Sequence, residues 1–159
     1  MNLQLAQTNT TSGHDKSIQL VTFYLSGEEY GLGITRIREI IGMVPITRLP
    51  HASNYVQGLI NLRGEVIPIF DMRCWFGLSH IPGSSNSIVI AEWGAEYFGF
   101  MVDSVHQVVW LPQYQIDPPT IHFQKRSPYI MGLGKYEGRI LILLDLEALF
   151  RGAEEEAIT

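Results

Sequence analysis

The stretch that most limits the possible folds of this chain is the apolar segment Gly58 to Asp71, GLINLRGEVIPIFD, which polar residues interrupt once. Two apolar runs flank Arg63-Gly64, and a two-residue connection of this kind is typical of a β-hairpin in which Gly64 takes a positive φ. Pro68 lacks an N–H group, which predicts that the second arm presents this position to a sheet edge or a bulge. Asp71 ends the second arm and is placed to cap a short helix.

The same pattern occurs a second time in the chain. Laid over GLGKYEGRILILLDLEALF (132–150), the segment 58–76 aligns without gaps at an offset of 74, and five of the nineteen pairs are identical. A weaker match at an offset of 68 places 28–41 over 96–109. Two unrelated hairpins can match over this length by chance, but the same order of elements in both halves favours duplication of one supersecondary unit.

The repeat separates the positions that the fold needs from those that it leaves free. At the hairpin tip, Asn61 and Arg63 stand opposite Lys135 and Glu137. The hairpin is therefore expected to need neither the Asn nor the Arg, and Arg63 is predicted to be functional rather than structural. Its guanidinium is suited to orient a neighbouring carboxylate or to pair with a partner, in a geometry that Lys does not reproduce.

The remaining segments predict an all-β protein with short helices. The expected strands of the first half are IQLVTFYL, YGLGI extended after a kink by TRIREII, and the edge segment ITRL, with one helical turn in HASNYVQG. The isoleucines of TRIREII also fit a helical face, but β-branched residues at the matching place, MVDSVHQVV, favour a strand. The second half repeats the plan with SIVIAEW, GAEYFGFMV and DSVHQVVWL, and DLEALFRG is expected to form a capped C-terminal helix.

The boundaries of the folded part follow from composition. Residues 1–17 are polar without an apolar period and are predicted to be a disordered tail, and 151–159 a frayed acidic tail. The segment SHIPGSSNS is the clearest linker signal and separates the two halves.

Charge and cysteine content exclude several classes of function. The net charge is −5, from 11 basic and 16 acidic residues, and no basic stripe is present, so nucleic acid is not an expected partner. No apolar stretch approaches the roughly 18 residues that would span a membrane, and no signal sequence opens the chain, so we expect a cytoplasmic protein without membrane insertion. The single Cys74 is expected to be a buried, inert thiol.

No catalytic or metal-binding set emerges from the motifs. The five histidines are scattered without a partner at ligand spacing, so neither a metal nor a cofactor is predicted. Asp103, Ser104 and His106 superficially offer part of a hydrolase triad, but residues three apart on a strand point to opposite faces, and no nucleophile elbow is present. These absences favour a binding module over an enzyme.

Several motifs together are similar to those of one family. The elements IREII, ITRLP, YVQGLINLRGEVIPIFDMR, MVDSV and ILILLDLEALF resemble the CheW coupling-protein family of bacterial chemosensory systems, from Ile18 to about Phe150. The NLRG element with its flanks is the specific part. The resemblance implies two small five-stranded β-barrels packed on a shared apolar core, the first at about 18–79 and the second at about 87–150, within a CheW-like domain spanning 18–150.

The resemblance also implies a function in signal transduction. Members of the family are scaffolds of two-component chemotaxis systems that bridge the cytoplasmic helical tips of methyl-accepting chemoreceptors and the regulatory domain of the histidine kinase CheA. That kinase domain is similar to the coupling protein, so the two can alternate in rings within receptor arrays. A stand-alone ligand-sensing β-barrel module is the alternative, and an enzyme is the third possibility.

Candidate partner contacts follow from the repeat and the resemblance. Ile37, Glu39 and Ile40 are expected to line a groove between the barrels that takes the receptor helix, with Gly58 and Arg63 near the same surface. The loop from Pro118 to Pro128 carries Ile121 and Phe123 and is predicted to contact the kinase or the array, unless it folds back over the core.

Overall fold

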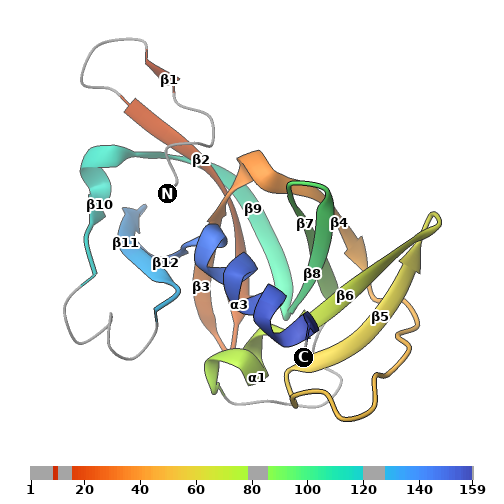
Figure 1. The fold of residues 1–159 in the computed structure, drawn as a ribbon. Helices are drawn as coiled ribbons and strands as arrows, with labels where there is room; N and C mark the ends of the chain where they lie inside the picture. The colour runs from red at the N-terminus through yellow and green to blue at the C-terminus, as the bar shows by residue number, and fades with distance from the viewer. Residues whose placement is uncertain (1–8, 11–15, 79–85, 120–127, 159) are drawn as a thin grey trace. The chain divides into compact units, whose positions relative to one another are not determined.

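The computed structural model of the 159-residue chain describes residues 9–10, 16–78, 86–119 and 128–158. These residues lie mostly in strands of two sheets (Figure 1). The chain divides into two compact units: unit 1 comprises Met1–Thr35 and Val105–Leu149, and unit 2 comprises Arg36–Ser104 and Phe150–Thr159. The predicted all-β class is confirmed.

The sheet of unit 1 contains five long strands and two of only two residues. In the described residues its order is β1-β2-β3-β12-β11-β10, and β9 pairs with β2 outside this path. The strands are β1 (Asn9–Thr10), β2 (Lys16–Leu25), β3 (Glu28–Gly33), β9 (Ser104–Pro112), β10 (Ile116–Asp117), β11 (Ile130–Tyr136) and β12 (Arg139–Leu144). A 3-10 turn, η3 (Gln113–Gln115), connects β9 to β10.

The sheet of unit 2 has five strands in the order β4-β7-β8-β6-β5. They are β4 (Ile37–Gly42), β5 (Val56–Leu62), β6 (Glu65–Asp71), β7 (Ser87–Trp93) and β8 (Glu96–Val102). The kink predicted before β4 is the 3-10 turn η2 (Ile34–Arg36). The strand interpretation of TRIREII is therefore correct from Ile37 onward.

Each sheet takes strands from both halves of the chain. β3 runs parallel to β12 with Gly31 opposite Leu143, and β8 runs parallel to β6 with Gly99 opposite Ile69. The repeat offset of 68 relates Gly31 to Gly99, and the offset of 74 relates Leu143 to Ile69, so the two parallel pairs are equivalent. Each half of the chain therefore contributes one hairpin to each sheet. The predicted barrel boundaries of 18–79 and 87–150 are wrong for this reason: the first hairpin of each half completes its sheet with the second hairpin of the other half.

The two apolar cores follow the same symmetry. In unit 1, Leu20, Leu141 and Leu143 are fully buried, and Ile88, Ile67 and Ile69 occupy the equivalent places in unit 2. Inward-facing aliphatics on alternate strand positions explain why both copies keep a period of two.

Two described α-helices follow the hairpins. α1 (Met72–Phe76) is capped by Asp71, whose carboxylate accepts from the backbone N–H groups of Arg73 and Cys74 at 3.0 and 3.4 Å. α3 (Leu146–Ile158) follows Asp145, whose carboxylate accepts from the Ala148 N–H at 3.3 Å. Both predicted caps are confirmed.

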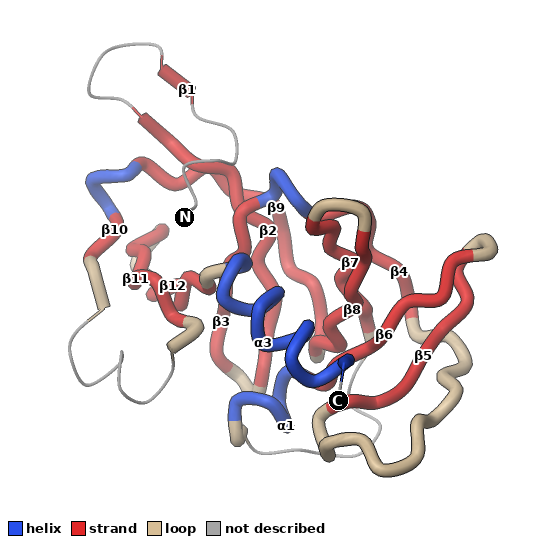
Figure 2. Tube along the Cα trace, viewed as in Figure 1, coloured by secondary structure: helices blue, strands red, loops and turns tan. Residues whose placement is uncertain are grey.

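Several local expectations were wrong. α3 continues to Ile158, so 151–158 is helical rather than a frayed tail. Residues 9–10 of the predicted disordered tail pair with β2, and the rest of that tail up to Asp15 lies outside the described residues. ITRL forms only one bridge, between Thr47 and Leu59, and HASNYVQG contains turns and the start of β5 in place of a helical turn, so the connection from β4 to β5 is a loop (Figure 2).

The described helices include none with the length and hydropathy needed to span a lipid bilayer. Cys74 is half-buried rather than buried, and its thiol donates to the Asp71 carboxylate at 3.6 Å. Burial, reinforced by this carboxylate, raises the pKa of the Cys74 thiol, which keeps it in the unreactive protonated form.

Candidate functional site

The tip of the β5–β6 hairpin is a tight turn with positive φ at both central residues. Arg63 has φ of 50° and Gly64 of 91°, the combination that matches the twist of the flanking strands. The Asn61 side chain accepts from the Gly64 N–H at 2.9 Å. Asn61 therefore supports the turn locally, although the other copy has Lys135 at this position.

Arg63 uses its side chain across the surface of unit 2. Its guanidinium pairs with the carboxylate of Glu39 on β4, while the Arg63 side chain remains 69 % exposed and that of Glu39 29 %. An exposed ion pair of this kind contributes only about 0–1 kcal/mol to stability. The fold gains little from the pair, which leaves both groups available to a partner.

A hollow of about 270 Å³ lies beside this ion pair. Its lining combines four charged side chains with aliphatic and aromatic ones; the charged residues are Arg38, Glu39, Arg63 and Glu65. Arg38 donates to Glu92 at 3.2 Å and lies over the Tyr97 ring at 5.3 Å. The bond to Glu92 raises the pKa of Arg38, and the side chains of this pair remain 54 % and 40 % exposed.

The residues of β4 do not all share one face. Ile37 and Glu39 are half-buried, whereas Ile40 is exposed, because burial alternates along the strand. A bulge at Arg38 shifts the pairing with β7 between Ile37 and Glu39. The structure thus brings Glu39 and Arg63 together but places Ile40 on the opposite face of the strand.

Gly58 has a structural reason for its identity. Its φ is +145°, and an added Cβ would lie 2.1 Å from the carbonyl oxygen of Thr47. Thr47 and Leu59 exchange two backbone hydrogen bonds of 2.8 Å, which bring the two segments this close. Ile121 and Phe123 lie outside the described residues, and the groove expected between the barrels stays a prediction.

The exposure of two aliphatic side chains was not predicted from the sequence. Val66 and Ile140 were assigned to apolar arms, yet they are 64 % and 63 % exposed. The offset of 74 makes them equivalent, each two residues beyond the turn glycine of its hairpin. The strand alternation contained the signal, since Val66 precedes the buried Ile67 and Ile140 precedes the buried Leu141.

Charged groups elsewhere are tied to separate partners. Asp103 pairs with the buried Arg73 at 3.0 Å, whereas His106 contacts Glu29 at 2.9 Å, so the two are not arranged as a catalytic pair. Within the described ranges, no group of three or more His, Cys, Asp or Glu side chains is arranged to hold a metal ion. The features suited to recognition in unit 2 are the exposed ion pair, the hollow and the exposed Val66.

Comparison with known proteins agrees with this arrangement. A family model described as the CheW-like domain matches residues 19–154. The chain is 34 % identical over 152 residues to the Chemotaxis protein CheW of Klebsiella aerogenes, covering 94 % of this chain and 92 % of that protein. It is 30 % identical over 134 residues to the Chemotaxis protein CheW of Bacillus subtilis, covering 82 % and 85 %.

A solved structure is also similar. The scaffolding protein TtCheW from Thermoanaerobacter tengcongensis superposes with a TM-score of 0.75 at 31 % identity, over 80 % of this chain and 88 % of that one.

Proposed function

The chain belongs to the CheW-like domain family, and from this we propose that it is a non-enzymatic adaptor that couples the cytoplasmic tips of chemoreceptors to the histidine kinase CheA. Similarity to chemotaxis proteins and to a scaffolding protein over most of the chain carries the proposal. An adaptor needs separate surfaces for separate partners and no reacting groups.

We propose that the receptor contacts unit 2 at β4 and the hairpin tip. Glu39 and Arg63 form an exposed ion pair that the fold does not require, since Gln107 and Glu137 replace them in the other copy. Ile37 and Ile40 supply apolar contact on either side of the strand. A receptor helix that carries charged residues can exchange with this pair at little cost in stability.

Gly58 affects the proposed receptor surface through its close contact with Thr47. A side chain there would displace Thr47, and with it the loop that follows β4. Its proposed effect on receptor binding is therefore indirect.

The kinase is proposed to contact the exposed aliphatics of the hairpins. Val66 and Ile140 occupy equivalent positions in two units of one architecture. The regulatory domain of the kinase is expected to resemble this protein, so it can offer similar hairpins in return. Ile121 and Phe123 stay candidates for a further contact with the kinase or the array. Recruitment from the cytoplasm to membrane-bound receptor arrays follows from binding both partners.

Kinase activity in reconstituted receptor vesicles tests the proposal. Wild-type protein should raise the activity of CheA in the presence of receptor, and Arg63→Ala should abolish this coupling while leaving the melting temperature nearly unchanged. Lys135→Ala, which removes an exposed cation from the hairpin of unit 1, is the control. Failure of the wild-type protein to bind receptor or kinase would favour a stand-alone ligand-sensing module instead.

A further inference from the structure

The equivalent place in unit 1 is occupied by a polar cluster around Glu29. The repeat offsets relate four residues of this cluster to residues that surround the hollow: Glu29 to Tyr97, His106 to Arg38, Arg139 to Glu65, and Glu137 to Arg63. The chemical type changes at each of these positions. Both units therefore carry polar side chains at these equivalent positions, but the side chains form ion pairs around Glu29 in unit 1 and line a hollow in unit 2.

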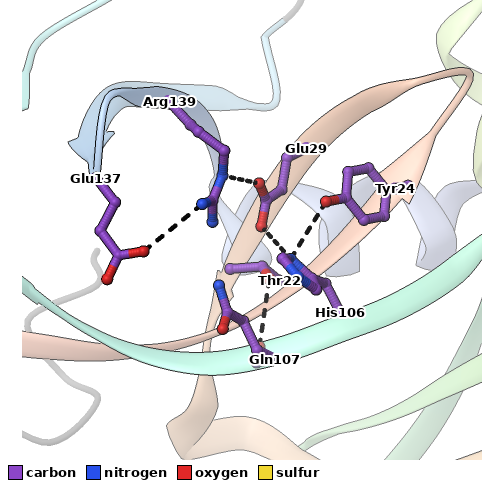
Figure 3. A network of polar contacts seen from close by, with 7 residues as sticks. All are labelled: Thr22, Tyr24, Glu29, His106, Gln107, Glu137 and Arg139. Carbon is purple, nitrogen blue, oxygen red and sulfur yellow. Dashed lines mark hydrogen bonds and ion pairs between the residues drawn. The ribbon is translucent and has the colours of Figure 1, made fainter.

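Glu29 is the centre of the cluster (Figure 3). Its side chain is only 5 % exposed, and one carboxylate oxygen lies 2.9 Å from His106 Nδ1 while the other lies 3.0 Å from Arg139 Nε. Since a carboxylate only accepts, Nδ1 is the protonated nitrogen of the imidazole. The Tyr24 hydroxyl lies 3.3 Å from the same nitrogen, and Arg139 Nη1 lies 3.7 Å from Glu137.

The cluster fastens a part of the sheet that backbone pairing leaves open. The pairing between β3 and β12 begins at Tyr30 and Ile142, so Glu29 and Arg139 lie beyond it toward the hairpin tip. Glu29 also reaches His106 on β9, and three strands are thereby joined by one buried carboxylate. The Glu29 side chain is 5 % exposed, whereas its partners His106 and Arg139 are 36 % and 38 % exposed. Solvent therefore screens these pairs in part, but less than a pair in which both side chains are exposed.

The exposed Ile140 follows Arg139 directly on β12. Because side chains alternate along a strand, Arg139 points toward the cluster and Ile140 points away from it. Fixing the guanidinium fixes the backbone from which Ile140 projects. In unit 2 the matching Glu65 lines the hollow and directly precedes Val66 on β6.

We propose that Glu29, His106 and Arg139 are positioning residues that hold Ile140 in the orientation the kinase recognises, and that this makes the hairpin ends of the two units non-interchangeable. The inference rests on the proposed function, since it assigns the Ile140 surface to the kinase. It adds that the hollow of unit 2 and the polar cluster of unit 1 are two versions of one site with different tasks.

Titration calorimetry with the isolated kinase regulatory domain and, separately, with a receptor-tip fragment tests the inference. Glu29→Gln keeps the shape of the side chain but removes its charge, and should weaken kinase binding about tenfold while leaving receptor binding within about twofold. Arg139→Lys, which keeps the charge but not the Nε contact, should weaken it in the same direction. Lys135→Gln, on β11 of the same hairpin, breaks the exposed 3.1 Å pair with Asp117 on β10 and serves as the matched control.

Two further readouts separate positioning from general destabilisation. A merely destabilised protein that is still folded binds with unchanged affinity, whereas a loosened hairpin shows faster amide hydrogen exchange confined to β11 and β12. Normal kinase affinity of Glu29→Gln, with Ile140→Ser impaired, would overturn the positioning role alone. Normal affinity of Ile140→Ser would overturn the docking surface itself and the inference with it.

Discussion

At the scale of single residues, Glu29 links stability to pH. Burial alone would raise the pKa of Glu29, but the hydrogen bonds from His106 and Arg139 outweigh it and lower the pKa below its usual value of 4.5. A carboxylate with a lowered pKa stabilises the folded state fully above pH 4.5, and this contribution disappears as the pH falls through the lowered value.

Glu29→Gln should therefore lose about 1–3 kcal/mol of unfolding free energy at pH 7 and progressively less toward pH 3. Urea unfolding followed by circular dichroism between pH 3 and 7 measures the difference between variant and wild type. Glu28→Gln, at the exposed neighbouring position, is the control and should show no such trend. A difference that stays constant down to pH 3 would contradict the ionised state of Glu29.

Gly99 is a second residue whose identity is fixed by its surroundings. An added Cβ would lie 2.4 Å from Ile69 Cδ1 and 3.0 Å from Ile88 Cγ2, both in a tightly packed core. Gly99→Ala should cost about 1–3 kcal/mol by overpacking. At Gly31, the equivalent place in unit 1, an added Cβ would lie 3.2 Å from Leu143 Cδ2 and 3.4 Å from Leu20 Cδ1, so Gly31→Ala should cost clearly less. Equal losses in thermal unfolding would argue against this packing difference.

At the scale of elements, Asp71 both caps α1 and lies beside a buried arginine. Its carboxylate caps α1 and lies 3.9 Å from Nε of Arg73, which is itself buried and bonded to Asp103. Asp71→Ala removes the cap and part of the charge balance of a buried arginine, and should cost about 2–4 kcal/mol. Asp145→Ala, which removes only the equivalent cap of α3, should cost about 1 kcal/mol. Chemical denaturation of both variants gives the comparison, and equal losses would mean that Arg73 does not depend on Asp71.

Elements with a local cause were predictable from the sequence. The hairpins follow from Arg63-Gly64 and its counterpart between alternating apolar runs, and the caps follow from an Asp placed before each helix. Pro68 was predicted at a sheet edge or a bulge; β6 is an internal strand of its sheet, but its pairing is interrupted at Pro68. Pro68 lies opposite Leu59 on β5, but the backbone N–H and C=O groups of Leu59 bond to Thr47 and not to Pro68. On the other side of β6, pairing with β8 begins only at Ile69, so the missing N–H of Pro68 costs no hydrogen bond.

Contacts distant in sequence were not predictable in the same way. The ion pair of Arg63 with Glu39 was anticipated only as a pairing with some neighbouring carboxylate, because its partner depends on how the β5–β6 hairpin lies against β4. The cluster around Glu29 was missed for the same reason, because only the sheet brings Arg139 and His106 to this residue.

At the scale of the whole molecule, the exchange of hairpins interleaves the two units along the chain. The two segments of unit 1 are separated by Arg36–Ser104, all of which belongs to unit 2. α3 begins in unit 1 and continues in unit 2 from Phe150, so one helix supplies buried side chains to both. No point of division in the sequence yields one complete unit on each side.

This interleaving predicts that the two units unfold together. With unit 2 unfolded, unit 1 would have to close a disordered loop of 69 residues (104 − 36 + 1), at an entropic cost of about 4 kcal/mol. That cost is comparable to the whole stability of a marginal domain, about 5–15 kcal/mol. Unit 1 is therefore not expected to persist alone.

The tryptophans provide a probe in each unit, since Trp110 lies in unit 1 and Trp93 in unit 2. Variants in which the third tryptophan, Trp75 of unit 2, is replaced and only Trp93 or only Trp110 is kept should give coincident urea transitions by fluorescence. Adding Gly99→Ala, a change confined to unit 2, should lower both midpoints together because the insertion must fold for unit 1 to close. A Trp110 transition that stays at its original midpoint while that of Trp93 falls would show instead that unit 1 folds independently of the segment inserted into it.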